Sequence, residues 1–122
     1  MEYKEWCKNA GEAYAILCKC GMRFPGITPG TALGHAMWRT KLLQRWLRQY
    51  YATLNGKMTN EERDIVISVV TEDISNFPAK IDDNSQIQVL LGFWQKDFNI
   101  KKQKRKAEIN SRPDHYFTAE KF

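Results

Sequence analysis

The sequence predicts an all-α fold: a compact, four-helix bundle-like domain over residues 1–100, followed by a basic, partly disordered C-terminal tail over residues 101–122. Three observations predict it. Large apolar residues recur at steps of three and four, which places side chains on one face of an α-helix. Residues typical of helix ends separate these segments. The 122 residues can bury one hydrophobic core but not two.

The first two helices are separated by a stretch rich in proline and glycine. Apolar spacing predicts the first helix at about residues 3–20, and Gly21 fits a C-terminal cap. The following loop runs to Gly30, because proline lacks the amide donor that a helix needs. Thr31 is then a candidate N-cap, and strong helix formers from Ala32 to Leu54 predict a second helix, which Asn55-Gly56 should end.

The last two helices are predicted mainly from their capping residues. Thr59 and Glu62 form a capping-box pattern, so a third helix should begin there, although its β-branched body favours a strand. Phe77-Pro78 should end it. The fourth helix is expected at about residues 84–99, after N-cap candidates at 82–85. Its large apolar residues step by three or four: Ile87, Leu90, Leu91, Trp94 and Phe98.

The net charge of +5 is unevenly distributed along the chain. Residues 1–56 carry a net charge of +5, residues 57–98 carry −4, and residues 99–122 carry +4. A basic balance favours acidic partners such as nucleic acid. The acidic middle implies that any such partner would bind one side of a polarised molecule.

The composition favours a protein of the cytoplasm. No apolar run is long enough to span a bilayer, and acids stand at the N-terminus where a signal peptide would have bases. Three cysteines fit free thiols better than a disulfide framework, which would normally have an even number. We therefore expect a cytoplasmic protein with no membrane partner.

The second helix is predicted to have two apolar faces, one of which packs inward. The opposite face carries two tryptophans flanked by bases, a combination that favours binding to protein or single-stranded nucleic acid. The alternative is that this helix is the central helix of the bundle, so that its tryptophans belong to the core. The candidate binding residues are Trp38, Arg39, Lys41, Leu42, Arg45, Trp46 and Arg48.

The tail carries a second basic cluster, with five bases in six residues. Such a cluster attracts phosphate backbones through counterion release, whatever the base sequence. The alternative is a solvated end that only aids solubility, since acids dilute the charge further along. The cluster consists of Lys101, Lys102, Lys104, Arg105 and Lys106.

No catalytic residue, cofactor or metal ligand is predicted. Three cysteines and His35 could form a zinc site in number, but their spacing lacks the close pairs that structural zinc sites use. His35 and His115 have no neighbouring nucleophile, and the glycines form no phosphate-binding loop. The sequence thus favours a non-enzymatic protein.

Two functions remain. The first is a nucleic-acid-binding accessory protein, for DNA or RNA, that uses the basic tryptophan-containing helix and the tail. The alternative is a small protein-interaction module, an inhibitor or adaptor such as a phage or other mobile element would encode, that docks the Trp38, Leu42 and Trp46 stripe on a partner. The same stripe could close a homodimer.

Overall fold

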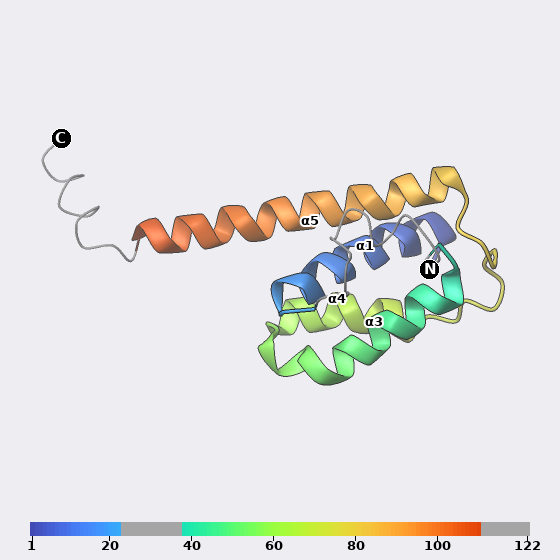
Figure 1. Cartoon of the computed structure of the whole chain (residues 1–122), viewed down its shortest axis with the longest axis horizontal. Helices are drawn as coiled ribbons and strands as arrows, with labels where there is room; N and C mark the ends of the chain where they lie inside the picture. The colour runs from blue at the N-terminus through green and yellow to red at the C-terminus, as the bar shows by residue number, and fades with distance from the viewer. Residues whose placement is uncertain (23–37, 111–122) are drawn as a thin grey trace, which may run out of the picture.

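The structure, a computed structural model, describes residues 1–22 and 38–110 and confirms the all-α prediction. Four α-helices and one 3₁₀ turn form these parts of the chain (Figure 1), which contain no β-strand beyond an isolated bridge between Arg39 and Lys80. The elements are α1 (Tyr3–Lys19), α3 (Thr40–Leu54), η1 (Asn55–Lys57), α4 (Asn60–Val70) and α5 (Asp83–Asn110).

Helix α1 lies at the centre of the bundle, between α5 on one side and α3 and α4 on the other (Figure 1). The five consecutive residues from Ala13 to Leu17 are all buried, so every side of this helix is covered there. A helix that is apolar all round belongs in a core. The central helix is therefore α1, and not the second predicted helix as the alternative interpretation of its tryptophans supposed.

Helices α1 and α5 touch through their backbones at two glycines. A Cβ atom on Gly11 would overlap the carbonyl oxygen of Val89, and one on Gly92 would overlap the carbonyl oxygen of Lys8. Beside them the ring of Phe93 packs edge-on against Tyr14, with ring centroids 5.3 Å apart. These contacts fix which face of α5 is turned toward the core.

The C-terminus of α1 confirms the predicted glycine cap. The N–H of Gly21 donates to the carbonyl of Cys18 at 3.1 Å, and the N–H of Met22 donates to Leu17 at 2.9 Å. This hydrogen-bond pair is a Schellman motif, which requires the left-handed backbone that Gly21 adopts at φ 107°.

Helix α3 begins later than the sequence predicts. Residues 31–37 lie outside the described parts, but Trp38 and Arg39 are not helical, and Arg39 has an extended backbone at φ −129° and ψ 126°. The carbonyl of Trp38 accepts the N–H of Ile81 at 3.0 Å. This pairing with a segment some 40 residues away holds the backbone extended up to Arg39, and the helix starts at Thr40.

The start of α4 confirms the predicted capping box. The Thr59 hydroxyl accepts the N–H of Glu62 at 3.2 Å, and the Glu62 carboxylate accepts the N–H of Thr59 at 2.9 Å. Helix α4 forms despite its β-branched residues, because its apolar face is buried against α1 and α3.

Helix α4 ends at Val70, earlier than the predicted end at Phe77-Pro78. Side chains of neighbouring helices take over its last carbonyls. Trp6 Nε1 donates to the carbonyl of Val69 at 3.1 Å, and Gln44 Nε2 donates to the same oxygen at 3.0 Å. Because these groups satisfy the end of the helix, the chain can leave it there.

Helix α5 starts as predicted but continues beyond the predicted end at residue 99. The Asp82 carboxylate accepts the N–H of Ser85 at 2.8 Å, as an N-cap does. The helix then runs for 28 residues to Asn110, about 42 Å, and its last part projects beyond the bundle (Figure 1). Lysine, arginine, glutamine and alanine favour helix there even without tertiary contacts.

Candidate interaction surface on helix α5

The exposed tryptophan stripe expected on the second helix is not formed. Trp38 precedes α3 and is only 8% exposed, within the hydrophobic core. Leu42 and Trp46 lie on α3, but both are half-buried and packed against that core. The alternative interpretation, that these tryptophans are core residues, holds for Trp38. Neither a nucleobase nor a side chain of a partner protein can reach it.

The basic residues at the start of α3 and along it differ in their contacts. Arg39, Lys41 and Arg45 are exposed. The Arg48 guanidinium donates from Nη2 to the carbonyl of Val70 at 2.8 Å and from Nε at 3.3 Å, so it caps the C-terminus of α4. Of the predicted binding residues in this region, Arg48 therefore has a structural role in the bundle.

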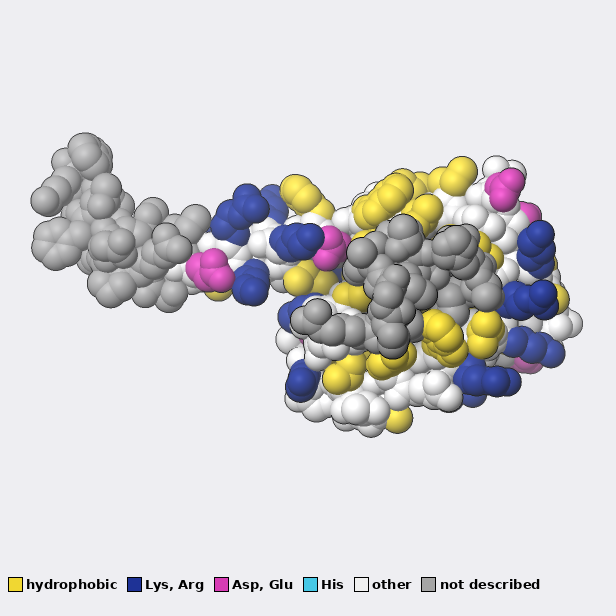
Figure 2. Space-filling view, in the orientation of Figure 1, with side chains coloured by type: hydrophobic (Ala, Val, Ile, Leu, Met, Phe, Trp, Pro, Cys, Tyr) yellow, Lys and Arg dark blue, Asp and Glu magenta, His cyan; other side chains and the backbone are white. Residues whose placement is uncertain are grey.

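The outer face of α5 carries the exposed apolar surface that the sequence placed on the second helix. Four large apolar residues follow one another there at steps of four, three and four, which puts them on one side of the helix. The opposite side holds Gly92 and Val89 against α1. Hydrophobic side chains gather along the outer side over the bundle (Figure 2). The outer stripe consists of Ile87, Leu91, Trp94 and Phe98, which are 52%, 40%, 54% and 66% exposed.

The sequence contained the signal for this surface. The spacing of the outer stripe served to predict the helix, but a second apolar set, which includes Val89 and Phe93, lies on the opposite side of the same helix. A helix with two apolar faces must expose one of them unless elements cover both. A shallow hollow on this face is lined by Trp94, Phe98, Gln95 and Asn99.

The predicted basic cluster lies on the projecting end of α5, residues 101–110, which we call the arm. All side chains from 101 to 108 are exposed, and Lys and Arg side chains surround this part of the helix (Figure 2). Lys101 pairs with Asp97 at 2.9 Å, one helical turn earlier. Lys101 and Arg105 follow Phe98 at steps of three and four, so the outer stripe continues into a basic stripe.

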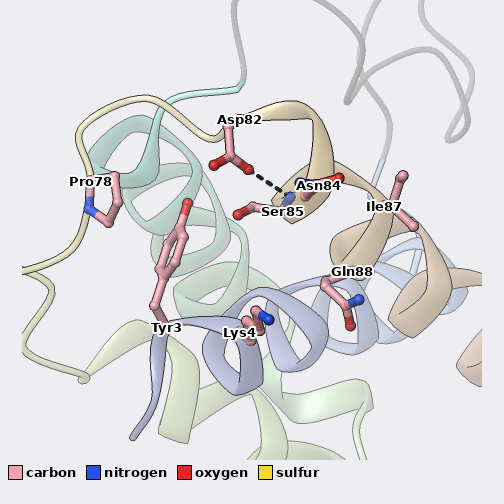
Figure 3. A pocket seen from close by; sticks show the side chains of 8 residues that line it. All are labelled: Tyr3, Lys4, Pro78, Asp82, Asn84, Ser85, Ile87 and Gln88. Carbon is pink, nitrogen blue, oxygen red and sulfur yellow. Dashed lines mark hydrogen bonds between the residues drawn. The ribbon is translucent and has the colours of Figure 1, made fainter.

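The other end of α5 carries two acids and borders a pocket that Lys4 of α1 also lines (Figure 3). Asp82 and Asp83 are both exposed there. The amide of Ser85 lowers the pKa of Asp82 by hydrogen bonding to its carboxylate, which makes this acid a poor base. Burial raises the pKa of the nearby Tyr3 phenol, which stays protonated. Asp82 thus caps α5, and the Tyr3 ring packs against the core.

The cysteines have the properties of core residues. Burial raises the pKa of Cys7 to about 11 and that of Cys18 to about 12, and it also raises the pKa of Cys20. Protonated thiols are poor nucleophiles and poor metal ligands. Within the described parts of the chain, no group of three or more histidine, cysteine or acidic residues could hold a metal ion. His35 and His115 lie outside the described residues.

Comparisons of the chain with protein-family models, curated proteins and solved structures found no match. Among the described helices, none is both long enough and apolar enough to cross a bilayer. The two features that stand out on the described surface are the outer stripe and the basic arm, which follow one another along α5.

Proposed function

We propose that this chain is a nucleic-acid-binding accessory protein that holds phosphate groups, of DNA or RNA, with the arm of α5. The observation that carries the proposal is the exposure of all five clustered bases on a helix that projects away from the bundle. A projecting helix can approach a polyanion without steric hindrance from its own domain. Each phosphate that it neutralises releases counterions, which drives binding regardless of base sequence.

The acidic end of α5 does not oppose this role. Asp83 and Lys101 are separated by 18 residues of continuous helix, about 27 Å. Charges that far apart at the surface are screened at physiological salt, where the Debye length is about 8 Å. Lys41 and Arg45, exposed on α3, supply a second basic region. Binding through the arm is therefore expected to be electrostatic and weakly selective.

Base stacking by Trp38 and Trp46, in and just before α3, is not part of this proposal. Trp38 is buried and Trp46 is half-buried, so neither offers a free ring face of the kind that single-stranded nucleic acids stack on. The arm itself contains no aromatic residue between 101 and 108. Duplex and single-stranded oligonucleotides of similar charge density are thus expected to compete for the same site.

Fluorescence anisotropy with labelled oligonucleotides at about 50 and 200 mM salt tests the proposal. The arm variant replaces four bases by glutamine and keeps Lys101, whose ion pair with Asp97 supports the helix. A matched control removes four exposed bases from the body of the protein. The arm variant changes Lys102, Lys104, Arg105 and Lys106, and the control changes Lys4, Lys8, Lys57 and Lys80.

We expect the wild type to bind at low salt and to lose affinity steeply as salt rises. The arm variant should bind at least about tenfold more weakly, and the magnitude of its log–log salt slope should fall by about 3 to 4 if each base meets one phosphate. The control should keep most of the affinity. Equal losses in the two variants would mean that total charge, and not the arm, attracts nucleic acid.

A second function is favoured by the outer stripe. Four large apolar side chains that are 40–66% exposed on one helix face are typical of a protein interface. In this role the chain would be a protein-interaction module, an inhibitor or adaptor such as a phage would encode. Binding would then depend on Trp94 and respond little to salt. Both functions fit a reducing cytoplasm, where the three cysteines would stay free.

A further inference from the structure

We propose that the outer stripe of α5 is a self-association surface, on which the outer stripe of a second copy of this chain docks antiparallel. The proposal goes beyond nucleic-acid binding and does not depend on it. Its starting point is that α5 is held in a fixed rotation by the glycine contacts on its inner face. The outer stripe therefore cannot turn into the core of its own bundle.

The spacing of the outer stripe suits a helix partner. Ile87, Leu91, Trp94 and Phe98 follow one another at four, three and four residues, which is the spacing of the seam in a helix pair. An antiparallel copy in register would place Ile87 against the second copy's Phe98 and Leu91 against its Trp94. Each aromatic ring would thus meet an aliphatic side chain. A parallel copy would instead set Trp94 against Trp94 and Phe98 against Phe98.

Charge complementarity selects the second copy and the antiparallel direction. The outer stripe is flanked by Asp83 at one end and by Lys102 at the other, and both side chains are exposed. Asp82 caps α5 and Lys101 pairs with Asp97, so the complementarity depends on Asp83 and Lys102. In the same register, Lys102 lies at the same level along the helix pair as the second copy's Asp83, across the seam. A parallel copy would bring like charges together at both ends of the outer stripe.

This charge pattern also argues against nucleic acid as the occupant of the outer stripe. A phosphate backbone that followed the stripe from Phe98 toward Ile87 would approach Asp82 and Asp83, which repel it. A surface with one acidic end and one basic end is self-complementary about a two-fold axis, as a symmetric dimer requires. The seam covers less than two heptads, so the dimer should be weak, with a dissociation constant in the micromolar range.

Sedimentation equilibrium of the full chain from about 1 to 200 μM, without nucleic acid, tests the proposal. The wild type should shift from monomer to dimer as its concentration rises. Leu91→Glu combined with Trp94→Glu places two acids on the outer stripe and should keep the protein monomeric throughout. The matched control is Ile67→Glu on α4, since Ile67 is also exposed, at 39%, but lies outside the outer stripe. Circular dichroism confirms that each variant folds.

A charge exchange tests the direction of pairing. Asp83→Lys and Lys102→Glu should each weaken the dimer about fivefold or more, because each occurs twice in a symmetric interface and places like charges at the same level across the seam. The double variant should recover most of the affinity. Recovery supports the antiparallel register, whereas equal or greater weakening in the double variant overturns it.

The proposal is overturned if the wild type stays monomeric over the whole concentration range. That outcome would mean that something else covers the outer stripe, such as another segment of this chain or a different protein. A dimer that persists in the Leu91→Glu, Trp94→Glu variant would overturn it as well. Because no oligonucleotide is present, a failure of nucleic-acid binding leaves these outcomes unaffected.

Discussion

The two faces of α5 are both apolar, yet they make opposite kinds of contact. On the inner face, Gly92 and Val89 lie so close to α1 that backbone touches backbone. On the outer face, Trp94 and Phe98 have more than half of their surface in solvent. The comparison shows that small residues, which allow close approach, mark the packed face of this helix better than large ones do.

The largest effect on stability is expected from adding a side-chain atom to the inner face of α5. In Gly92→Ala the added methyl group would overlap the Lys8 carbonyl, so α1 and α5 must separate, and we expect a loss of about 3 kcal/mol or more in the free energy of unfolding. Urea denaturation measures it. The control is Gly56→Ala in η1, where nothing lies within 4 Å of the new atom and the effect should be below about 1 kcal/mol. Similar effects for the two variants would contradict the close contact.

A polar contact inside the bundle comes next in expected effect. Gln44 is buried and donates to the carbonyls of Val69 and Glu72, at 3.0 and 2.9 Å. Gln44→Ala leaves the Glu72 carbonyl without this donor and should lower the free energy of unfolding by about 1 to 3 kcal/mol. Gln49→Ala, on the exposed side of the same helix, is the matched control and should change little. Equal stability of the two variants would show that water replaces Gln44 at no cost.

The ion pair at Glu62 gives a smaller, pH-dependent effect. Burial acts to raise the pKa of this carboxyl, but the Lys19 ammonium, 2.7 Å away, and the Thr59 amide hold it below its usual value. A carboxyl whose pKa is lower in the folded state stabilises the fold above its unfolded pKa and loses this contribution as pH falls through the folded value. Glu62→Gln should therefore cost about 1 kcal/mol at pH 7.

Urea titrations of wild type and Glu62→Gln at pH 7, 4 and 3 measure this dependence. The stability difference between them should shrink toward the lowest pH, because the wild-type carboxyl becomes protonated. Glu61→Gln, at the exposed neighbouring position, is the control and should not show it. A difference that stays constant with pH would mean that the variant loses packing or a cap rather than a charge contribution.

Local chemistry made part of the fold predictable. Gly21 and the Thr59–Glu62 capping box act within one turn of helix, so their residue types indicate both a helix end and a helix start correctly. The start of α3 depends instead on pairing between Trp38 and Ile81, far apart in the sequence. No local pattern encodes that contact, and helix formers around Trp38 suggested a continuous helix.

The candidate surface was predictable only in part, for the same reason. The basic cluster is visible in the sequence from Lys101 onward, and its exposure follows from its charge. Which tryptophan faces solvent depends on which helix is central, and the centre turned out to be α1. Its small residues Ala10, Gly11 and Ala13 were a usable signal, since a helix packed on all sides needs narrow faces.

The smallest effect on stability is expected on the outer face of α5. In Trp94→Gln, measured at about 1 μM protein so that the proposed dimer is dissociated, the free energy of unfolding should change by no more than about 0.5 kcal/mol. The side chain is 54% exposed and contributes little to the bundle. Raising the protein concentration should separate the variant from the wild type, because only the wild type gains stability by association. A loss above about 1 kcal/mol already at low concentration would mean that Trp94 is covered within its own chain, and the contrast between the two faces of α5 would then disappear.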